Sequence, residues 1–526
     1  MVRPLPPLAL AVALLTTSGI RALAQCADGS PPPCRAAARP PAPPASNTIA
    51  VLYFDNLSRD SADVYLAYGL TEDLINRLTQ IEKLQVKSRT AVARLRGRSD
   101  RDPAAVGRTL GVSQLLSGSV QRAGSRVRVI VELTRASSGN SVWGRSFDRP
   151  ADDLLGVQAE IAESIAVHVA GRLAPAERKR FVEQPTRNPR AYDHFMRGRF
   201  YAGTSTVDGI LNAVREFQHA ARLDSTMLGA YLGLALTYGN LASLYYRPDV
   251  GISRDSLGAL SSAALARAAK LDSLSPDVAL ARSQRADAAQ SIGWLDSAVA
   301  RAPRSAAARY SYGLALRSLG LYDDAYAQFE RSIALEPDRP MAILALAQTR
   351  LLQRRPREAL AWIDSAIAGF RPDAYFFYAD QGFLRLQLGD TAGARAAAEV
   401  TGRHDDGTGT REVILAMIDA RAGDTASARR RMTVVESLLA RSDCQLTHAC
   451  LELAWGWAAA GDRDRAIVTF ERITPRGSWL AIWSDRPQFD PLRSDPRFAR
   501  IVDESRAIRT QLLRQSGNAD PKRFVP

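Results

Sequence analysis

Residues 48–78 read TIAVLYFDNLSRDSADVYLAYGLTEDLINRL and decide the fold of the first domain. The nearly continuous apolar run over 49–54 is typical of a strand that is buried on both faces of a sheet. The leucines Leu66, Leu70, Leu74 and Leu78 then recur at helical spacing, which predicts an amphipathic helix over 66–81. A buried strand followed directly by such a helix predicts an α/β domain.

The residues that follow extend this pattern to about residue 174. Further strands are expected at 84–86, 113–120, 126–133 and 141–147. A helix should begin at Asp102-Pro103, because Asp caps free amides and Pro suits the first helical turn. A last amphipathic helix is expected over 154–169. These elements predict a small α/β domain with a mixed sheet over residues 48–174.

The same stretch resembles a known family. Residues 48–78, together with LGVSQLLSGSVQRAGSRVRVIVELTRASSGNSVWGRSFDRPADDLLGVQAEIAESIAVHV at 110–169, closely resemble the TolB amino-terminal-like domain. In many bacterial proteins that domain precedes tetratricopeptide (TPR) repeats, and in relatives it commonly follows a cyclase, a kinase or a winged-helix domain. The resemblance implies a binding or regulatory unit.

From residue 191 onward the chain repeats with a period typical of TPR proteins. Ala325, Ala359, Ala394 and Ala428 are spaced by 34, 35 and 34 residues, and Ala466 follows after 38. A turn glycine lies five residues before four of these alanines, at Gly320, Gly389, Gly423 and Gly461. This signature predicts an all-α TPR solenoid of about five to eight repeats over 191–475, after a linker at 175–190.

The two ends carry segments of another kind. Residues 1–24 predict a signal peptide with cleavage after Ala24, because the apolar core precedes an A-x-A site at Ala22-Leu23-Ala24. A proline- and alanine-rich linker follows at 25–47, and 476–526 predict a capping helix with a flexible tail. The protein is therefore expected outside the cytoplasm, in the periplasm, with envelope association as an alternative and no stable transmembrane segment after cleavage.

Four cysteines fall into two close pairs, Cys26 with Cys34 and Cys444 with Cys450. In an exported protein such spacing favours two local disulfides, with unpaired thiols as the alternative.

The net charge of +14 does not predict a nucleic-acid partner. Arginine supplies 64 of the 69 basic residues, and these arginines are scattered rather than gathered in a stripe with interleaved aromatic residues.

Catalytic motifs are sparse. The sequence contains no Gly-x4-Gly-Lys-Ser/Thr loop, none of the kinase signatures and no pair of cyclase-type aspartates. The only local cluster of ligand-capable residues is His404-Asp405-Asp406 in a glycine-rich loop. We therefore expect no enzyme, no cofactor and no metal site.

Two sets of residues are candidate partner contacts. Arg317, Arg350, Arg385 and Arg421 recur in or beside the first helix of successive repeats and could line one groove, which would suit an acidic peptide or a carboxylate terminus. Asn56 and Ser58 follow the first strand, where ligands bind in α/β domains, although both residue types also stabilise turns.

The predicted function is a non-enzymatic exported adaptor that binds protein partners. The main alternative is a regulatory module that senses a small ligand and acts on a separate effector protein. A hydrolase that uses the His404 loop and a nucleic-acid-binding protein are weaker alternatives.

Overall fold

The computed structural model describes most of residues 45–516. It omits 61–62, 82, 94, 96–101, 172–183, 205, 243–250, 338, 371–373, 375, 405–407, 441–446 and 474–481. The predicted signal peptide and residues 25–44 of the predicted linker, and also Cys26, Cys34 and Cys444, lie outside the described residues. The described residues from Ser46 onward form one compact unit.

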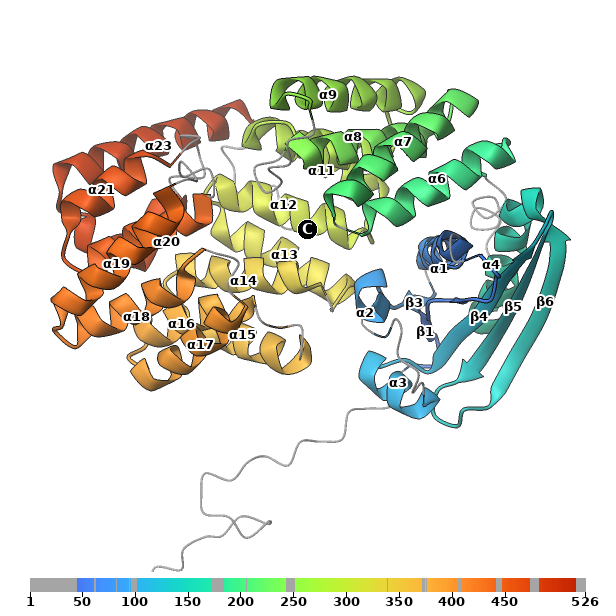
Figure 1. The fold of residues 1–526 in the computed structure, drawn as a ribbon, viewed down its shortest axis with the longest axis horizontal. Helices are drawn as coiled ribbons and strands as arrows, with labels where there is room; N and C mark the ends of the chain where they lie inside the picture. The colour runs from blue at the N-terminus through green and yellow to red at the C-terminus, as the bar shows by residue number, and fades with distance from the viewer. Residues whose placement is uncertain are drawn as a thin grey trace, which may run out of the picture. The chain divides into compact units, whose positions relative to one another are not determined.

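The first part of that unit is an α/β domain (Figure 1). Its strands are β1 (Thr48–Val51), β2 (Asp55–Asn56), β3 (Gln85–Val86), β4 (Gln114–Ala123), β5 (Arg126–Arg135) and β6 (Ser141–Pro150). Its helices are α1 (Val64–Thr79), α2 (Arg89–Ala93), α3 (Pro103–Leu110) and α4 (Leu154–Ala170), the last preceded by the 3₁₀ turn η2 (Ala151–Asp153).

The sheet is mixed, as predicted. Its order is β3-β1-β4-β5-β6, and β2 also pairs with β4. The pairs β1/β3, β1/β4 and β2/β4 are parallel, whereas β4/β5 and β5/β6 are antiparallel. The capping expected before α3 is present, because the Asp102 carboxylate accepts hydrogen bonds from the amides of Ala104 and Ala105.

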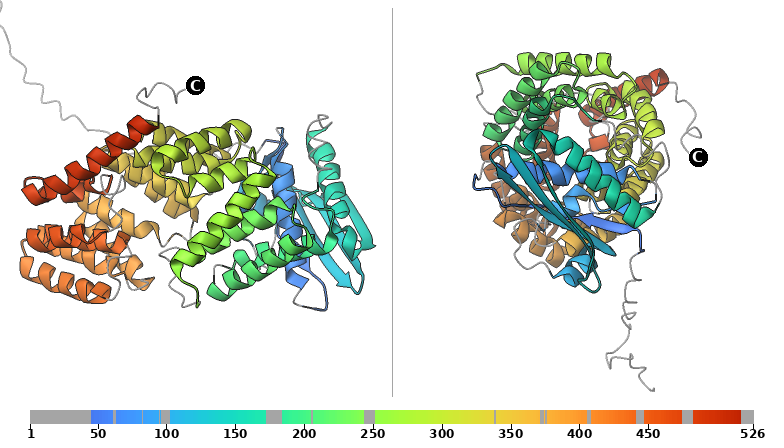
Figure 2. Two further views of the ribbon diagram at one scale, coloured as in Figure 1. Left: turned by 90° about the horizontal axis from the view of Figure 1, so that it is seen from above. Right: turned by 90° about the vertical axis from the view of Figure 1, so that its right-hand side faces the viewer.

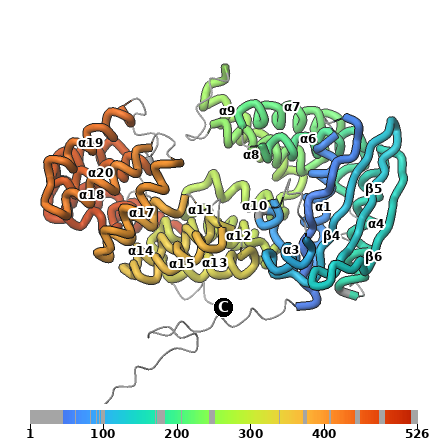
Figure 3. Tube along the Cα trace, turned by 60° about the horizontal axis from the view of Figure 1, so that its bottom comes forward, coloured from blue at the N-terminus to red at the C-terminus, as the bar shows by residue number. Residues whose placement is uncertain are grey.

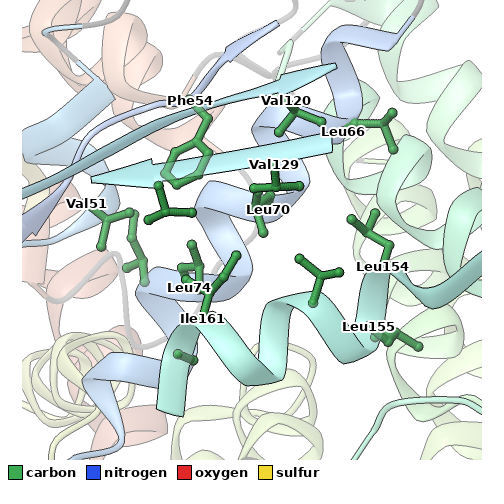
Figure 4. Packing of buried hydrophobic residues seen from close by; sticks show 14 of the residues in the cluster. Val51, Phe54, Leu66, Leu70, Leu74, Val120, Val129, Leu154, Leu155 and Ile161 are labelled. Carbon is green, nitrogen blue, oxygen red and sulfur yellow. The ribbon is translucent and has the colours of Figure 1, made fainter. Parts of the chain in front are cut away.

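Strand β1 is buried on both faces because helices cover both sides of the sheet. Ile49 and Val51 belong to the apolar cluster that α1 and α4 form on one side, which Figure 4 shows around Leu70 and Ile161. Ala50 and Leu52 belong to the cluster under α2 and α3 on the other side. The alternation of side chains along a strand explains this division, and it accounts for an apolar run without polar interruption.

The described residues from 189 to 471 form eight successive helix pairs, at the upper end of the predicted range. The pairs are α6 (Pro189–Ala202) with α7 (Val207–Leu223), α8 (Leu228–Ala242) with α9 (Arg254–Leu271), α10 (Pro276–Ser283) with α11 (Ala288–Arg301), α12 (Ala306–Ser318) with α13 (Tyr322–Leu335), α14 (Pro340–Leu352) with α15 (Pro356–Phe370), α16 (Phe377–Gln387) with α17 (Thr391–Arg403), α18 (Thr410–Arg421) with α19 (Thr425–Leu439), and α20 (Thr447–Ala459) with α21 (Arg463–Glu471). Figure 3 shows them following one another in chain order.

Small residues let the two helices of a pair approach each other. The five alanines that define the repeat period, Ala325, Ala359, Ala394, Ala428 and Ala466, are all completely buried. The four turn glycines before them have positive φ, between 76° and 89°, a conformation that L side chains rarely adopt. The repeat signature therefore marks both the helix crossings and the turns.

The chain ends on a cap that returns to the middle of the solenoid. It comprises the described residues from Ile482 onward, with the 3₁₀ helix η4 (Pro487–Leu492) and helix α23 (Pro496–Gln515). Phe489, Leu492 and Phe498 are buried against α20 and α21. The far end of α23 contacts α11, and Figure 2 (left) shows this red helix beside the yellow-green helices.

The α/β domain is attached to the first solenoid helix. The Tyr65 hydroxyl in α1 donates a hydrogen bond of 2.5 Å to Asp193 in α6, and the Arg197 guanidinium lies 4.6 Å from the centre of the Tyr65 ring. Farther along the solenoid, Arg304 donates to the carbonyl oxygens of Ile81 and Leu84, at 3.1 and 2.9 Å.

Replacing Gly313 by Ala tests the close helix approach within one pair. A methyl group at Gly313 would lie 2.5 Å from the ring of the fully buried Phe329, so we expect a loss of about 1–3 kcal/mol in the free energy of unfolding. In the matched control Gly293→Ala, in α11, the methyl group meets nothing within 4 Å. That variant should gain about 0.5–1 kcal/mol. Urea unfolding measures both, and equal changes would contradict the role of Gly313.

Candidate functional site

The first helices of neighbouring pairs contact one another along most of the solenoid. They therefore form a continuous surface, which we call the inner face. It comprises α6, α8, α10, α12, α14, α16, α18 and α20.

The four arginines expected to line a groove all lie in inner-face helices. They are Arg317 in α12, Arg350 in α14, Arg385 in α16 and Arg421 in α18. The structure thus places them in successive repeats. It also gives each of them partners within the chain, which the sequence did not indicate.

Two of these arginines link neighbouring repeats. Arg317, whose residue is 8% exposed, donates to the Ala345 carbonyl oxygen at 3.2 Å and to the Gln348 side-chain oxygen at 3.3 Å. Arg421 donates to the Leu386 carbonyl oxygen at 2.6 Å. Both guanidiniums therefore donate to main-chain carbonyl oxygens of an adjacent repeat.

The other two arginines are held by carboxylates. Arg350 lies 3.1 Å from Glu358, and its guanidinium carbon is 3.5 Å from the centre of the Tyr326 ring. Arg385 lies 2.6 Å from Asp390 and 3.7 Å from Asp364. Their side chains remain 15% and 27% exposed, so a partner carboxylate could compete for them. Their role as partner contacts stays a proposal.

A cluster of polar side chains occupies the later part of the inner face. Gln348 in α14 donates to Asp380 in α16 at 3.4 Å. Burial raises the pKa of Asp380 above its ordinary value. In α20, His448 contacts the Glu452 carboxylate at 2.9 Å. Burial alone would lower the pKa of His448, but Glu452 outweighs it and raises that pKa, which favours the imidazolium.

The cap lies beside this cluster and binds the solenoid through charged groups. Asp490 in η4 accepts two hydrogen bonds from Arg354, at 2.7 and 3.0 Å. Asp485 accepts one from the Tyr322 hydroxyl at 3.0 Å and one from Arg509 at 3.3 Å. Arg354 and Tyr322 belong to two repeats that precede the cap by more than 130 residues in the chain, whereas Arg509 belongs to α23 of the cap itself.

Arg354 departs from the repeat pattern. It lies five residues before Ala359, where other repeats carry the turn glycine, and it adopts a φ of 60°. A residue with a side chain in this region costs about 1–2 kcal/mol relative to its usual conformation. The ion pair with Asp490 gives this strained residue a specific contact that a glycine could not make.

Asn56 and Ser58, the loop candidates, hold the loop against the sheet. The Asn56 side-chain oxygen accepts a hydrogen bond from the Ser58 amide at 3.0 Å, which is a turn contact. The Ser58 hydroxyl accepts one from the Arg122 amide at 2.9 Å. Both side chains therefore have hydrogen-bond partners within the chain, and their role in binding a partner or ligand stays a proposal.

Sequence reasoning missed the buried carboxylate of Glu72, which joins three elements. Its side chain, 3% exposed, accepts a hydrogen bond of 2.7 Å from the Tyr53 hydroxyl. It also pairs with Arg89 in α2 at 3.0 Å and with Arg199 in α6 at 3.5 Å. Only the fold brings these partners together, since they lie far apart in sequence.

A cavity of about 520 Å³ lies where the sheet meets α6. It is lined by the tip of the β4–β5 hairpin, the end of β6, α1 and the start of α6. Its lining residues include Arg122, Arg126, Asp152, Arg190, Asp193 and His194.

Cys450 is disulfide-bonded, and no other cysteine is among the described residues, so its pairing with Cys444 remains a prediction. Within the described ranges, no group of three or more His, Cys, Asp or Glu residues could hold a metal ion. No helix in that part of the chain is long and apolar enough to cross a membrane.

No protein-family model matches this chain. A relative from Rhizobium meliloti (strain 1021), named "Putative adenylate cyclase 3", is 33% identical over 205 residues, which make up 39% of this chain and 35% of that protein. The chain therefore matches about a third of that relative's length.

Among solved structures, the chain is similar to PilW, a type IV pilus biogenesis factor, with 17% identity and a TM-score of 0.34 over 40% of this chain and 90% of that one. It is also similar to a tetratricopeptide repeat protein from Parabacteroides merdae, with 14% identity and a TM-score of 0.35 over 47% of this chain and 93% of that one. The likeness concerns the repeat fold, and the solenoid assignment rests on the helix pairs of this chain.

The strain at Arg354 can be measured in a background that lacks its ion pair. In Asp490→Asn the bidentate pair is lost, which for such exposed groups should cost about 0.2–1 kcal/mol. Adding Arg354→Gly to that variant should raise the free energy of unfolding by about 1 kcal/mol, because glycine accepts the positive φ. Urea unfolding of the single and double variants measures this gain. A double variant less stable than Asp490→Asn would show that the turn is not strained.

Proposed function

We propose that this protein is a non-enzymatic exported adaptor that binds protein partners through its TPR-type solenoid and its TolB-like α/β domain. The observation that carries the proposal is the inner face, where eight helix pairs present a continuous surface with charged side chains from successive repeats. Repeat solenoids use such extended surfaces to hold other proteins.

The attachment of the two parts supports a joint role. Tyr65 and Glu72 of α1 bond to Asp193 and Arg199 of α6, so the α/β domain is fixed to the first repeat by buried polar contacts. A partner that binds one part would thus encounter the other in a defined position. The predicted signal peptide places this adaptor in the periplasm, where it would organise an envelope complex.

The partner segment we propose is acidic. Arg350 and Arg385 are held by carboxylates of the chain itself, at 3.1 and 2.6 Å, so the environment already accommodates such groups. Arginine binds carboxylates through two parallel hydrogen bonds, which favours an acidic side chain or a carboxylate terminus of the partner.

The proposal excludes an enzymatic role for this chain. The sequence supports this part of the proposal, because it contains no nucleotide-binding, kinase or cyclase motif. The cyclase name belongs to a relative of which this chain matches 35%, and a match of that extent does not transfer an activity.

The double variant Arg350→Ala/Arg385→Ala tests the adaptor function. Crosslinking in intact cells, followed by identification of the captured proteins, should recover a partner with the wild-type protein and at least tenfold less of it with the double variant. Each arginine also makes contacts inside the chain, so the melting temperature should fall by a few degrees without unfolding at growth temperature. Arg357→Ala, an exposed arginine in the second helix α15, is the matched control. Equal capture by all three proteins would overturn the acidic-partner proposal.

A second candidate function is ligand sensing, and the cavity of about 520 Å³ between the sheet and α6 favours it. A ligand there would contact the α/β domain and the solenoid together, so binding could be transmitted between them.

Thermal unfolding against a panel of small metabolites tests this candidate. A ligand present at 100 times its dissociation constant should stabilise the protein by about 2.7 kcal/mol. The variant Ser125→Trp, which fills the cavity from the hairpin tip, should lose that stabilisation. If no compound stabilises the wild type more than this variant, the cavity is not a sensing site.

A further inference from the structure

The guanidinium of Arg486 is buried, and its Nε has no acceptor. Arg486 precedes η4 and is 4% exposed. Its guanidinium carbon lies 4.5 Å from the centre of the Trp483 ring and 5.2 Å from that of Trp455. Its Nε has no hydrogen-bond partner, although the carboxylates of Asp380 and Glu452 lie near enough to favour its charge. A buried cation in this state is unusual, since buried charges are normally paired.

Two neighbouring N–H groups also lack a hydrogen-bond acceptor. The Nε of Arg317 and the indole Nε1 of Trp455 are also buried without an acceptor. Arg317 and Arg486 are close enough to repel each other: burial, and after it the charge of Arg486, together lower the pKa of Arg317 to about 10. The unpaired groups of these three side chains are all N–H donors, so the missing group is an acceptor.

The charges of the cluster are also unbalanced. Arg317, Arg486 and a protonated His448 carry three positive charges, whereas Glu452 and Asp380 carry at most two negative ones. The raised pKa of Asp380 reduces the negative charge further. A bound anion would reduce this excess of positive charge.

One side chain of the cluster reaches the surface. The His448 side chain is 47% exposed, although Glu452 beside it is 2% exposed, and Asp380 is half-buried. The three donor atoms are themselves buried, so an anion that approaches past His448 must displace neighbouring side chains to reach them.

We propose that Arg317, Trp455 and Arg486 form an oxyanion site that takes one carboxylate or phosphate group. The oxyanion accepts hydrogen bonds from the three unpartnered donors, and the Trp455 and Trp483 rings flank Arg486. Because Arg317 belongs to α12 and Arg486 to the cap, the anion also ties the cap to the middle of the solenoid.

The oxyanion is either an acidic side chain of a protein partner or a free small anion. The first of these two sources rests on the proposed adaptor function. The donor chemistry is the same for both, so the experiment has an arm for each.

Thermal unfolding of the purified protein tests the site without any partner protein. Sodium phosphate, sodium succinate and a tri-glutamate peptide are compared with sodium chloride at equal ionic strength. We expect the first two, or the peptide, to raise the melting temperature by about 2–4 °C over chloride. A shift with the peptide alone assigns the site to a partner, and a shift with the free anions alone assigns it to a small ligand.

Three variants locate the effect. Arg486→Gln should lose the shift, whereas Arg354→Gln, which weakens the cap through a different contact, should keep it. Should Arg486→Gln not fold, Trp455→Phe removes one donor with little change in packing, and should raise the oxyanion concentration needed for the same shift several-fold. Equal shifts in wild type and Trp455→Phe, or no shift of the wild type beyond chloride, would overturn the site. Those outcomes leave the adaptor proposal standing, because partner capture is measured separately in Arg350→Ala/Arg385→Ala.

Discussion

The solenoid depends on the close crossing of two helices in each repeat, and that crossing depends on a residue no larger than alanine. Helix axes 8–10 Å apart leave no room for a longer side chain. Ala325 shows the consequence: it is fully buried, and the neighbouring Phe329 ring occupies the space that Gly313 leaves. Each crossing fixes the angle of its pair, so the first helices of successive pairs come together as one inner face. The charged clusters of that face exist only because the crossings recur.

The cap adds a second constraint, because it joins the end of the solenoid to its middle. Its apolar part, around Phe489 and Phe498, is as deeply buried as any core residue, so the cap is part of the fold. Its polar part behaves differently. Arg354 accepts an unfavourable φ to reach Asp490, and Arg486 is buried with no acceptor for its Nε. Backbone strain and buried unpaired groups both lower the stability of the folded state, and they are concentrated at sites of binding or conformational change.

Much of this architecture follows from the sequence, and the reason is periodicity. The apolar run at 49–54 predicted a buried strand, and the alanine spacing predicted the helix pairs, because both patterns repeat at short range. The polar contacts could not be predicted in this way. Glu72 pairs with Arg199, and Arg354 with Asp490, across separations that no local pattern encodes. The arginine series was visible in the sequence, but its intramolecular partners depend on side chains that only the folded chain brings near.

The central claim is that partners bind on the inner face. Site-specific photo-crosslinking in intact cells tests it directly, with the crosslinker at Ser311 in the inner-face helix α12, or at Val434 in α19, which is 53% exposed on a second helix. The account predicts a defined protein adduct from position 311 and none from position 434. Adducts from position 434 with none from position 311 would contradict it.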